Sequence, residues 1–285
     1  MKTFRIRNPE AVRISSYPCV MSLGFFDGIH LGHQKIIETA KQIAKQKNLK
    51  LAVMTFYPHP SSVIKKEGIT QYLTPLPEKE KQFKELGVDL LYVVEFDLNV
   101  AKIPHDVFVN QYLVRLGCKH AVAGFDFTYG FKGKGNMKQL KIDANNRFEV
   151  TTVSKFELFG QKVSSTLLRE KITSGRVEDV PFYLGETYKV NGVIRKEQTR
   201  HVLHVSDDYL LPCNGRYEVT VIEGNHRSKA ICEVADQHEL ILQFDQNMRI
   251  EEGVAVVIEW ENFITDADME ELHTSSSYER LVYSI

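Results

Sequence analysis

The sequence is poor in the features that mark a metal-binding, disulfide-bonded or membrane-spanning chain. Its four cysteines, Cys19, Cys118, Cys213 and Cys232, are scattered through 285 residues without a CxxC pair. No HExxH segment occurs either, so neither a zinc site nor a disulfide framework is indicated. No run of about 18 apolar residues could form a membrane span, and the residues before Pro9 lack the apolar core of a signal sequence. We therefore expect a cytoplasmic protein with no membrane partner.

A dominant charge of one sign is also absent. The 36 Lys and Arg residues nearly balance the 37 Asp and Glu residues, which gives a formal net charge of -1. Such a chain has no overall positive field to attract nucleic acid, so no nucleic-acid partner is expected and any anion site must be local. The length allows one large or two medium domains with a substantial core.

The P-loop segment GxxxxGK[ST] is missing, but another phosphate-binding pattern is present. A strand-like apolar run ends at Gly24 and leads into the sequence FFDGIHLGH, after which a helical pattern begins at once. Gly28 and Gly32 let a ligand approach the backbone, and the N-terminus of the helix favours an anion. His30 and His33 are three residues apart, so both can project toward one bound group. The segment predicts a phosphate site, with a cap or surface role for the histidines as the alternative.

Strand-like and helical segments alternate in the first part of the chain. The predicted strands are Val20–Leu23, Leu51–Phe56, Leu90–Glu95, His120–Ala123 and Phe148–Val153, and the predicted helices are Gln34–Gln46, Glu78–Leu86 and Pro104–Leu116. This alternation predicts an α/β fold, a Rossmann-like domain with a doubly wound parallel sheet that binds ligands at the carboxyl ends of its strands. The loops at 24–33, 55–60 and 124–135 all follow strands, so we expect them to converge on that edge.

The pattern changes near Leu184. Beyond it, short alternating or β-branched runs are separated by turn residues and predict a small antiparallel β-barrel or sandwich; the runs are Tyr188–Ile194, His201–Val205, Arg216–Ile222, Ser228–Val234, Leu240–Phe244 and Val254–Glu259. Residues 266–283 could form a short closing helix. We therefore expect one domain over residues 1–184 and a second over 185–285.

The segment Thr55–Pro60, TFYPHP, ends a predicted strand with a hydroxyl, two rings and an imidazole. Pro58 and Pro60 on either side of His59 exclude a helix and predict an extended turn. A rigid proline turn and a ligand-binding role are equally open on these residues alone.

The segment Gly124–Gly130, GFDFTYG, combines aromatic residues with glycines. A flat heteroaromatic ring could stack on its side chains. The alternative is that the aromatic side chains fix the loop to the core.

The segment Val163–Arg169, VSSTLLR, places hydroxyl groups where a helix should begin. Arg169 lies one turn inside that helix. Hydroxyls, the first backbone N–H groups and a guanidinium together suit a triphosphate. A plain N-cap with a surface arginine is the alternative.

Taken in order, these four segments resemble the motifs of the bacterial bifunctional riboflavin kinase/FMN adenylyltransferase family, the prokaryotic FAD synthases. Gly24–His33 matches its GxFDGxHxGH motif, Thr55–Pro60 its TFxPHP segment, Gly124–Gly130 its Gx[DN]FxFG loop, and Val163–Arg169 its [IV]SSTx[IL]R motif. Tyr129 stands in the aromatic position of the loop. The resemblance covers residues 18–190, and four ordered motifs are far more specific than any one of them.

The resemblance implies a nucleotidyltransferase domain that joins ATP and FMN to give FAD and pyrophosphate, with Mg²⁺ held mainly by the phosphates rather than by side chains. It implies catalytic roles for His30, His33 and Arg169. It implies an ATP site made by Gly24, Phe25, Phe26, Asp27, Gly28, Gly32, Ser164, Ser165, Thr166 and Arg169. It implies an FMN site made by Thr55, Phe56, Pro58, His59, Pro60, Gly124, Asp126, Phe127 and Gly130.

The second domain departs from the family pattern. The kinase segment G[FY]PTAN is absent, and Arg200–Asp207 stands in its place. Alignment on Phe244 puts His238 in the position of the catalytic glutamate and Glu239 one residue away, and a one-residue shift in a strand reverses the face. We therefore expect that the barrel persists while kinase activity is lost. The alternatives are a bifunctional enzyme, a non-catalytic flavin- or nucleotide-binding regulator, and nucleotidyl transfer to another phosphate.

Overall fold

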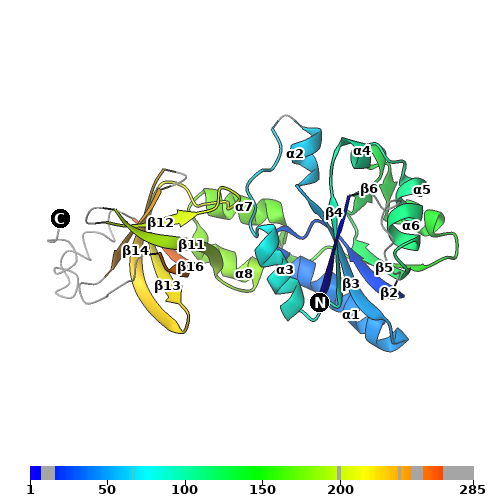
Figure 1. Ribbon diagram of the computed structural model, residues 1–285, viewed down its shortest axis with the longest axis horizontal. Coiled ribbons are helices and arrows are strands. Elements are labelled where there is room, and N and C mark those ends of the chain that lie inside the picture. Colours follow the sequence, from blue (N-terminus) through cyan, green and yellow to red (C-terminus); the bar gives the residue numbers. More distant parts are fainter. Residues whose placement is uncertain (8–16, 66, 198–199, 237–238, 245–252, 266–285) are drawn as a thin grey trace. The chain divides into compact units, whose positions relative to one another are not determined.

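The computed structural model describes residues 1–7, 17–65, 67–197, 200–236, 239–244 and 253–265 (Figure 1). The chain forms two compact units, Met1–Val163 and Ser164–Ile285, and each is described by itself. A domain boundary after residue 184, as the change of pattern predicts, stays a prediction.

A six-stranded parallel sheet forms the centre of the first unit. The strands are β1 (Lys2–Ile6), β2 (Cys19–Leu23), β3 (Lys50–Tyr57), β4 (Leu90–Glu95), β5 (Cys118–Gly124) and β8 (Glu149–Val153), in the order β1-β4-β3-β2-β5-β8. The inner strands are almost continuously buried, as strands covered on both faces must be. The predicted α/β fold with a doubly wound parallel sheet is confirmed.

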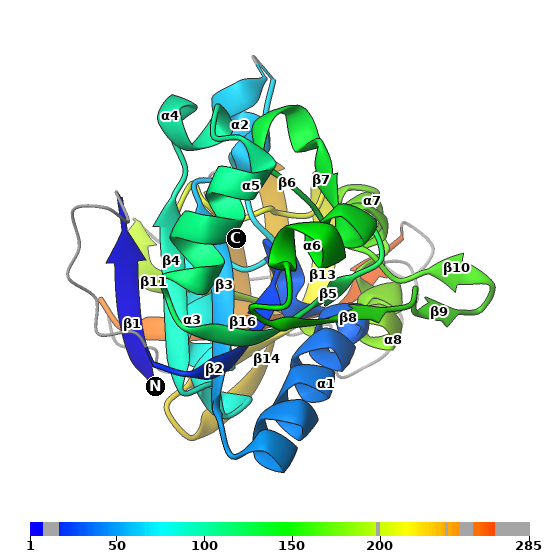
Figure 2. The ribbon, with the colours of Figure 1, turned by 90° about the vertical axis from the view of Figure 1, so that its right-hand side faces the viewer.

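Helices cover both faces of this sheet (Figure 2). They are α1 (Leu31–Lys47), α2 (Pro60–Ile64), α3 (Leu76–Glu85), α4 (Leu98–Ala101), α5 (His105–Phe108) and α6 (Met137–Ala144). Ile37 of α1 and Phe83 of α3 belong to the core on one face. Phe108, Tyr112 and Leu140 belong to the core on the other face. Alternate residues of β2 supply both cores, because successive strand side chains point to opposite sides.

Short elements complete the first unit. They are the 3-10 turns Asp27–Ile29 and Phe131–Gly133, the π-helix Val109–Val114 that continues α5, and the two-stranded pairs β6 (Thr128–Tyr129) with β7 (Gly135–Asn136) and β9 (Glu157–Leu158) with β10 (Gln161–Lys162).

The first unit differs from the sequence-based expectation in several short elements and in the following features. Strand β1 was not predicted, since its alternating charged and apolar residues form an exposed edge. Helix α6 was not predicted either. The exclusion of a helix within Thr55–Pro60 was wrong for the last of these residues, because α2 begins at Pro60. Proline is well tolerated in the first turn, where its missing N–H has no helical partner, and the His59 side chain caps the helix by accepting the Ser61 N–H.

The second unit begins with helices and ends in a closed barrel. Helices α7 (Ser165–Thr173) and α8 (Val180–Leu184), with the 3-10 turn Val177–Asp179 between them, precede six antiparallel strands: β11 (Tyr188–Glu197), β12 (Arg200–Val205), β13 (Gly215–Glu223), β14 (His226–Asp236), β15 (Glu239–Phe244) and β16 (Ala255–Ile264). They close in the order β11-β12-β15-β14-β13-β16. Tyr217 and Trp260 are fully buried and meet edge to face. The predicted antiparallel barrel is confirmed, whereas the closing helix predicted over 266–283 lies outside the described residues.

Candidate functional site

The turn between β2 and α1 is tightly constrained. Phe26, Gly28 and Ile29 all have positive φ, at 57°, 83° and 42°. For a β-branched residue such as Ile29 this conformation is strained, and such strain concentrates at functional sites. Helix α1 then begins at Leu31, and its first N–H groups face the turn. The structure therefore builds the anion-binding geometry that the sequence predicts.

The two histidines of this turn lie directly against each other. The rings of His30 and His33 stack with centroids 3.6 Å apart and planes 15° apart. His30 is the N-cap of α1, and its Nδ1 accepts the backbone N–H of His33 at 3.2 Å. Since Nδ1 is the acceptor, the ring proton of a neutral His30 is on Nε2. Nδ1 of His33 is buried and has no hydrogen-bond partner among the described residues.

Both imidazoles are neutral at physiological pH. Burial lowers the pKa of His30 from 6.5 to about 4, despite opposing contributions from its own backbone hydrogen bond and from Asp126. Burial, His30 and Lys79 together hold the pKa of His33 well below its usual range. The pair therefore offers N–H donors to a phosphate rather than two positive charges.

A buried lysine that sequence reasoning missed lies beside this turn. Lys79 of α3 is only 1% exposed, and its Nζ donates to the Phe25 carbonyl at 3.2 Å. The run EKEKQFKE is rich in charged residues and suggests an exposed helix face, so Lys79 was not recognised as a candidate. The signal that could have found it is helical spacing. Lys79 lies three residues after Leu76 and four before Phe83, both buried, so it lies on the buried face of α3.

The end of β3 packs against the same turn. The Thr55 hydroxyl is fully buried and donates to the Phe25 carbonyl at 2.8 Å. The ring of His59 meets the ring of Phe25 edge to face at 4.2 Å. Phe56 instead points into the core beside Phe108. The structure therefore brings Thr55 and His59 to the turn, whereas Phe56 is a core residue; FMN contacts by Thr55–Pro60 stay a prediction.

The loop after β5 lies on the other side of the turn. Strand β2 is flanked by β3 and β5 in the sheet, so the loops that follow all three strands share one edge. Asp126 is close enough to influence His30, and it pairs with Lys162 at 2.6 Å. Phe127 stacks on Tyr129 with centroids 5.9 Å apart. The predicted convergence of the loops at 24–33, 55–60 and 124–135 is confirmed.

A hydrogen-bond cluster fixes this loop. The carboxylate of Asp143 on α6 accepts from the Tyr129 hydroxyl at 2.6 Å and from the Gln139 amide at 2.8 Å, and lies 2.7 Å from Nδ1 of His105. A Cβ at Gly130, whose φ is +73°, would lie 2.6 Å from the His105 backbone, so only glycine fits there. The glycine of this motif thus has a packing role.

The hydroxyl-rich segment forms a helix start in the second unit, as its sequence predicts. Ser164 is the N-cap of α7, and its hydroxyl accepts the Leu167 N–H at 3.3 Å. Lys171 anchors the helix through an ion pair of 2.7 Å with Asp179. The phosphate contacts expected of Ser165, Thr166 and Arg169 stay a prediction.

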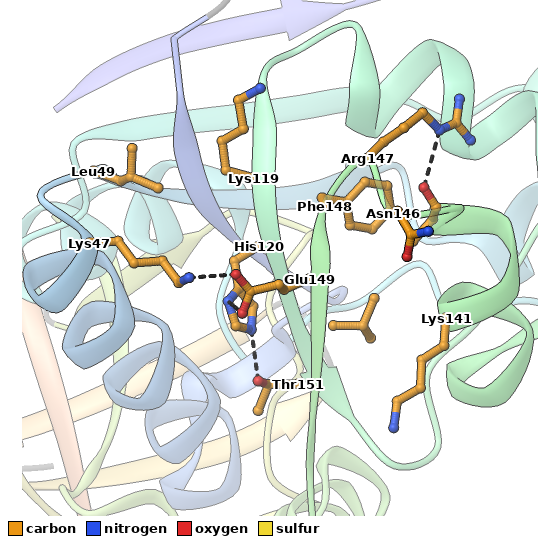
Figure 3. Close-up of a pocket in the computed structure, with 12 residues that line it drawn as sticks. Lys47, Leu49, Lys119, His120, Lys141, Asn146, Arg147, Phe148, Glu149 and Thr151 are labelled. Atoms are coloured by element: carbon orange, nitrogen blue, oxygen red, sulfur yellow. Dashed lines mark hydrogen bonds and ion pairs between the residues drawn. The ribbon is translucent and has the colours of Figure 1, made fainter.

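A cavity of about 720 Å³ lies at the opposite edge of the sheet, where β5 and β8 begin (Figure 3). Some of its polar groups are paired with one another: Lys47 pairs with Glu149 at 2.5 Å, and Nε2 of His120 lies 2.7 Å from the Thr151 hydroxyl. Arg147 is held by Asn110 and by nearby carbonyl groups. Size alone therefore does not make it the site, and the turn at the carboxyl edge remains the stronger candidate.

Two absences hold for the described part of the chain. No group of three or more His, Cys, Asp or Glu side chains there could hold a metal ion. No helix there is long and apolar enough to cross a membrane.

Known proteins resemble this chain along most of its length. A family model described as FAD synthetase matches residues 13–167. A bifunctional riboflavin kinase/FMN adenylyltransferase from Listeria monocytogenes is 46% identical over 231 residues, which cover 77% of this chain and 73% of the relative. A protein of the same description from Bacillus subtilis is 37% identical over 281 residues, which cover 91% and 89%. A second Listeria monocytogenes protein, described as FAD synthetase, is 33% identical and covers 71% of this chain and 81% of the relative.

A solved structure shows the same fold. A crystal structure described as a macrolide-efflux protein from Streptococcus pneumoniae matches with a TM-score of 0.85 at 27% identity, and the match covers 93% of this chain and 91% of that chain. The family match and the position of the histidine pair point to the same part of the molecule.

Proposed function

The chain belongs to the FAD synthetase family, and we propose that the turn at residues 24–33 is where the adenylyl group of ATP passes to FMN. The products of this reaction are FAD and pyrophosphate. The observation that carries the proposal is the stacked, neutral pair His30 and His33 at the N-terminus of α1. Donors fixed there cost no reorganisation when charge develops on a phosphate.

The reaction needs no side-chain nucleophile, because the FMN phosphate attacks the α-phosphorus itself. A new oxygen–phosphorus bond forms, the bond to the bridging β-phosphate oxygen breaks, and the leaving pyrophosphate carries away the negative charge. Catalysis then consists of alignment and charge stabilisation. His30 and His33 donate N–H groups to the ATP phosphates, with His33 nearer the α-phosphate. The remaining glycines and side chains of residues 24–33 form the wall of the ATP site.

The other motifs complete the assignment. Arg169, Ser165 and Thr166 hold the β- and γ-phosphates and the leaving pyrophosphate. Asp126 and Phe127 line the FMN pocket, and the turn Pro58–Pro60 lies beside the flavin phosphate. The family motifs support these roles, together with the cap geometry of α7.

Mg²⁺ fits the site as a substrate-borne ion. Magnesium keeps several waters and needs only one or two protein ligands when phosphates are present. Mg²⁺ would neutralise charge on the triphosphate, and no side chain is assigned to it.

We further propose that the barrel lacks riboflavin kinase activity. Strand β12 carries the residues Arg200–Val205 where the family pattern leads us to expect the PTAN segment. His238, which stands in the position of the catalytic glutamate, lies outside the described residues. The bifunctional relatives make the retained-kinase alternative worth testing.

The variant His33→Ala tests the proposed site. It removes a donor at the reacting phosphate, so FAD formation from FMN and ATP should fall by about 10²–10³-fold, as when an oxyanion donor is removed. His226→Ala, at the exposed β13–β14 hairpin, is the matched control and should retain activity. Near-normal turnover by His33→Ala, with a wild-type circular dichroism spectrum, would refute the assignment.

A further inference from the structure

The first unit buries a positive charge that the proposed mechanism does not use. The Lys79 side chain is almost completely enclosed, and its Nζ lies 4.0 Å from the centre of the Phe25 ring. The single hydrogen bond of the ammonium goes to the Phe25 carbonyl, at 3.2 Å. No carboxylate lies within ion-pair distance of it among the residues that the structure describes.

Burying this ammonium lowers the free energy of unfolding, so we expect the charge to serve a function. An ammonium carries three N–H donors, and only one of them is engaged with a described residue. A buried charge without an opposite partner destabilises a fold, and an apolar residue of similar volume is often better tolerated. A methionine would fill the same space without that penalty. The buried ammonium therefore indicates that a ligand binds nearby.

The position of Lys79 shows which partner this is. Its ammonium shares the Phe25 carbonyl with the Thr55 hydroxyl, so two elements, α3 and β3, hold one carbonyl of the turn. It is also close enough to contribute to the low pKa of His33. Lys79 therefore lies immediately behind the segment to which we assign the ATP phosphates.

No other group on this segment supplies a full positive charge. His30 and His33 are neutral, and the N-terminus of α1 contributes about half a charge. Lys162, on the loop side, is neutralised by Asp126. Arg169 and Mg²⁺ are assigned to the same triphosphate, but neither belongs to this turn, so a further charge here would help to compensate the phosphates as they leave water.

We propose that Lys79 is a further positioning residue of the adenylyl-transfer site: its buried ammonium fixes the Phe25 carbonyl and provides a positive charge that favours nucleotide phosphates at the turn 24–33. The proposal rests on the assignment of ATP to this turn. It assigns Lys79 a role that the four sequence motifs do not contain.

The titration of Lys79 gives the proposal a characteristic pH dependence. Burial lowers the pKa of its ammonium from 10.5 to about 8, and Asp27 opposes this shift. Asp27, His33 and Tyr72 are the titratable groups that face it, and the low pKa of His33 keeps that imidazole neutral over this range. The ammonium is charged at pH 7 and loses its proton as the pH rises through 8, so the attraction for phosphates should fall over that range.

The decisive experiment measures Mg²⁺–ATP binding calorimetrically, without FMN, from pH 7 to 9.5. Wild-type protein should bind about 10- to 100-fold more weakly at pH 9.5 than at pH 7, as expected when a charged hydrogen-bonding group is lost. Lys79→Met should be as weak as this at every pH. Lys79→Arg, which stays charged, should remove the pH dependence while retaining tighter binding than Lys79→Met. Lys81→Met, on an exposed position of the same helix, is the matched control.

The melting temperature of Lys79→Met distinguishes this role from a purely structural one. Lys79→Met removes an unpaired buried charge and leaves Thr55 on the Phe25 carbonyl, so its melting temperature should equal or exceed that of the wild type. Tight binding by Lys79→Met at pH 7, or a wild-type affinity that does not change with pH, overturns the proposal. So does weak binding accompanied by a lowered melting temperature. Absence of FAD formation by wild-type protein that still shows the pH-dependent binding would count against the function and not against Lys79.

Discussion

At the scale of single residues, the site works with neutral imidazoles held in fixed positions. The His30 ring is at once the cap of α1 and the stacking partner of His33. Its enclosure removes the charge that a histidine near a phosphate is usually expected to carry. The pair is therefore built for directed hydrogen bonds, and the positive charge has to come from elsewhere.

This burial makes the protein sensitive to acid. The pKa of His30 is about 4 in the folded chain and 6.5 when unfolded, so the unfolded state binds more protons between these values. Stability from this group is fully present above pH 6.5 and is lost as the pH falls toward 4, by about 3 kcal/mol in all. His30→Asn keeps a capping oxygen but cannot titrate. Urea unfolding at pH 7, 5.5 and 4.5 should show a shallower acid loss for His30→Asn, and equal slopes for the two proteins would contradict the account.

The histidine pair could be predicted from the sequence, and Lys79 could not. Gly28 can adopt the positive φ that the turn before His30 requires, so the sequence itself marks the turn. The neighbours of Lys79 in the sequence are charged, and its ammonium is covered by the ring of Phe25, from a distant segment, and lies near the ring of Tyr72. The local pattern gives only the spacing of Lys79 between Leu76 and Phe83, and not the rings that cover its ammonium.

At the scale of secondary-structure elements, the ends of β2, β3 and β5 position the loops of the site in the first unit, and α3 adds Lys79. Strands β2, β3 and β5 were predictable because buried parallel strands are continuously apolar. Strand β1 was not, because an edge strand with charged side chains resembles a loop. The helical segment after Pro104 was predicted, but its π-helical part depends on packing of Tyr112 and Leu113 into the core.

The loop after β5 should depend on its bond to α6. Tyr129→Phe removes a buried hydroxyl that donates to Asp143 at 2.6 Å, so the free energy of unfolding should fall by about 1.5–3 kcal/mol. Tyr112→Phe is the matched control: that hydroxyl is buried on the same face of the sheet without a described hydrogen-bond partner, so its loss should be neutral or stabilising. Chemical denaturation of both variants checks the difference. Equal losses in the two variants would show that the Asp143 cluster does not fix the loop.

At the scale of the whole molecule, one chain combines a nucleotidyltransferase unit with a complete β-barrel. The alternating barrel strands were predictable, because each must place one face inside. The residues that a kinase would need do not follow from barrel geometry, and a fold does not determine an activity. The barrel is therefore a folded unit whose enzymatic activity has to be determined by assay.

The most direct measurement separates the two reactions of the bifunctional relatives. The full chain is incubated with ATP and Mg²⁺ and either FMN or riboflavin, and the flavins are separated by chromatography. The account predicts FAD and an equal amount of pyrophosphate from FMN, and no FMN from riboflavin. Failure to form FAD from FMN would contradict the central claim, and FMN formed from riboflavin would show that the barrel is an active kinase.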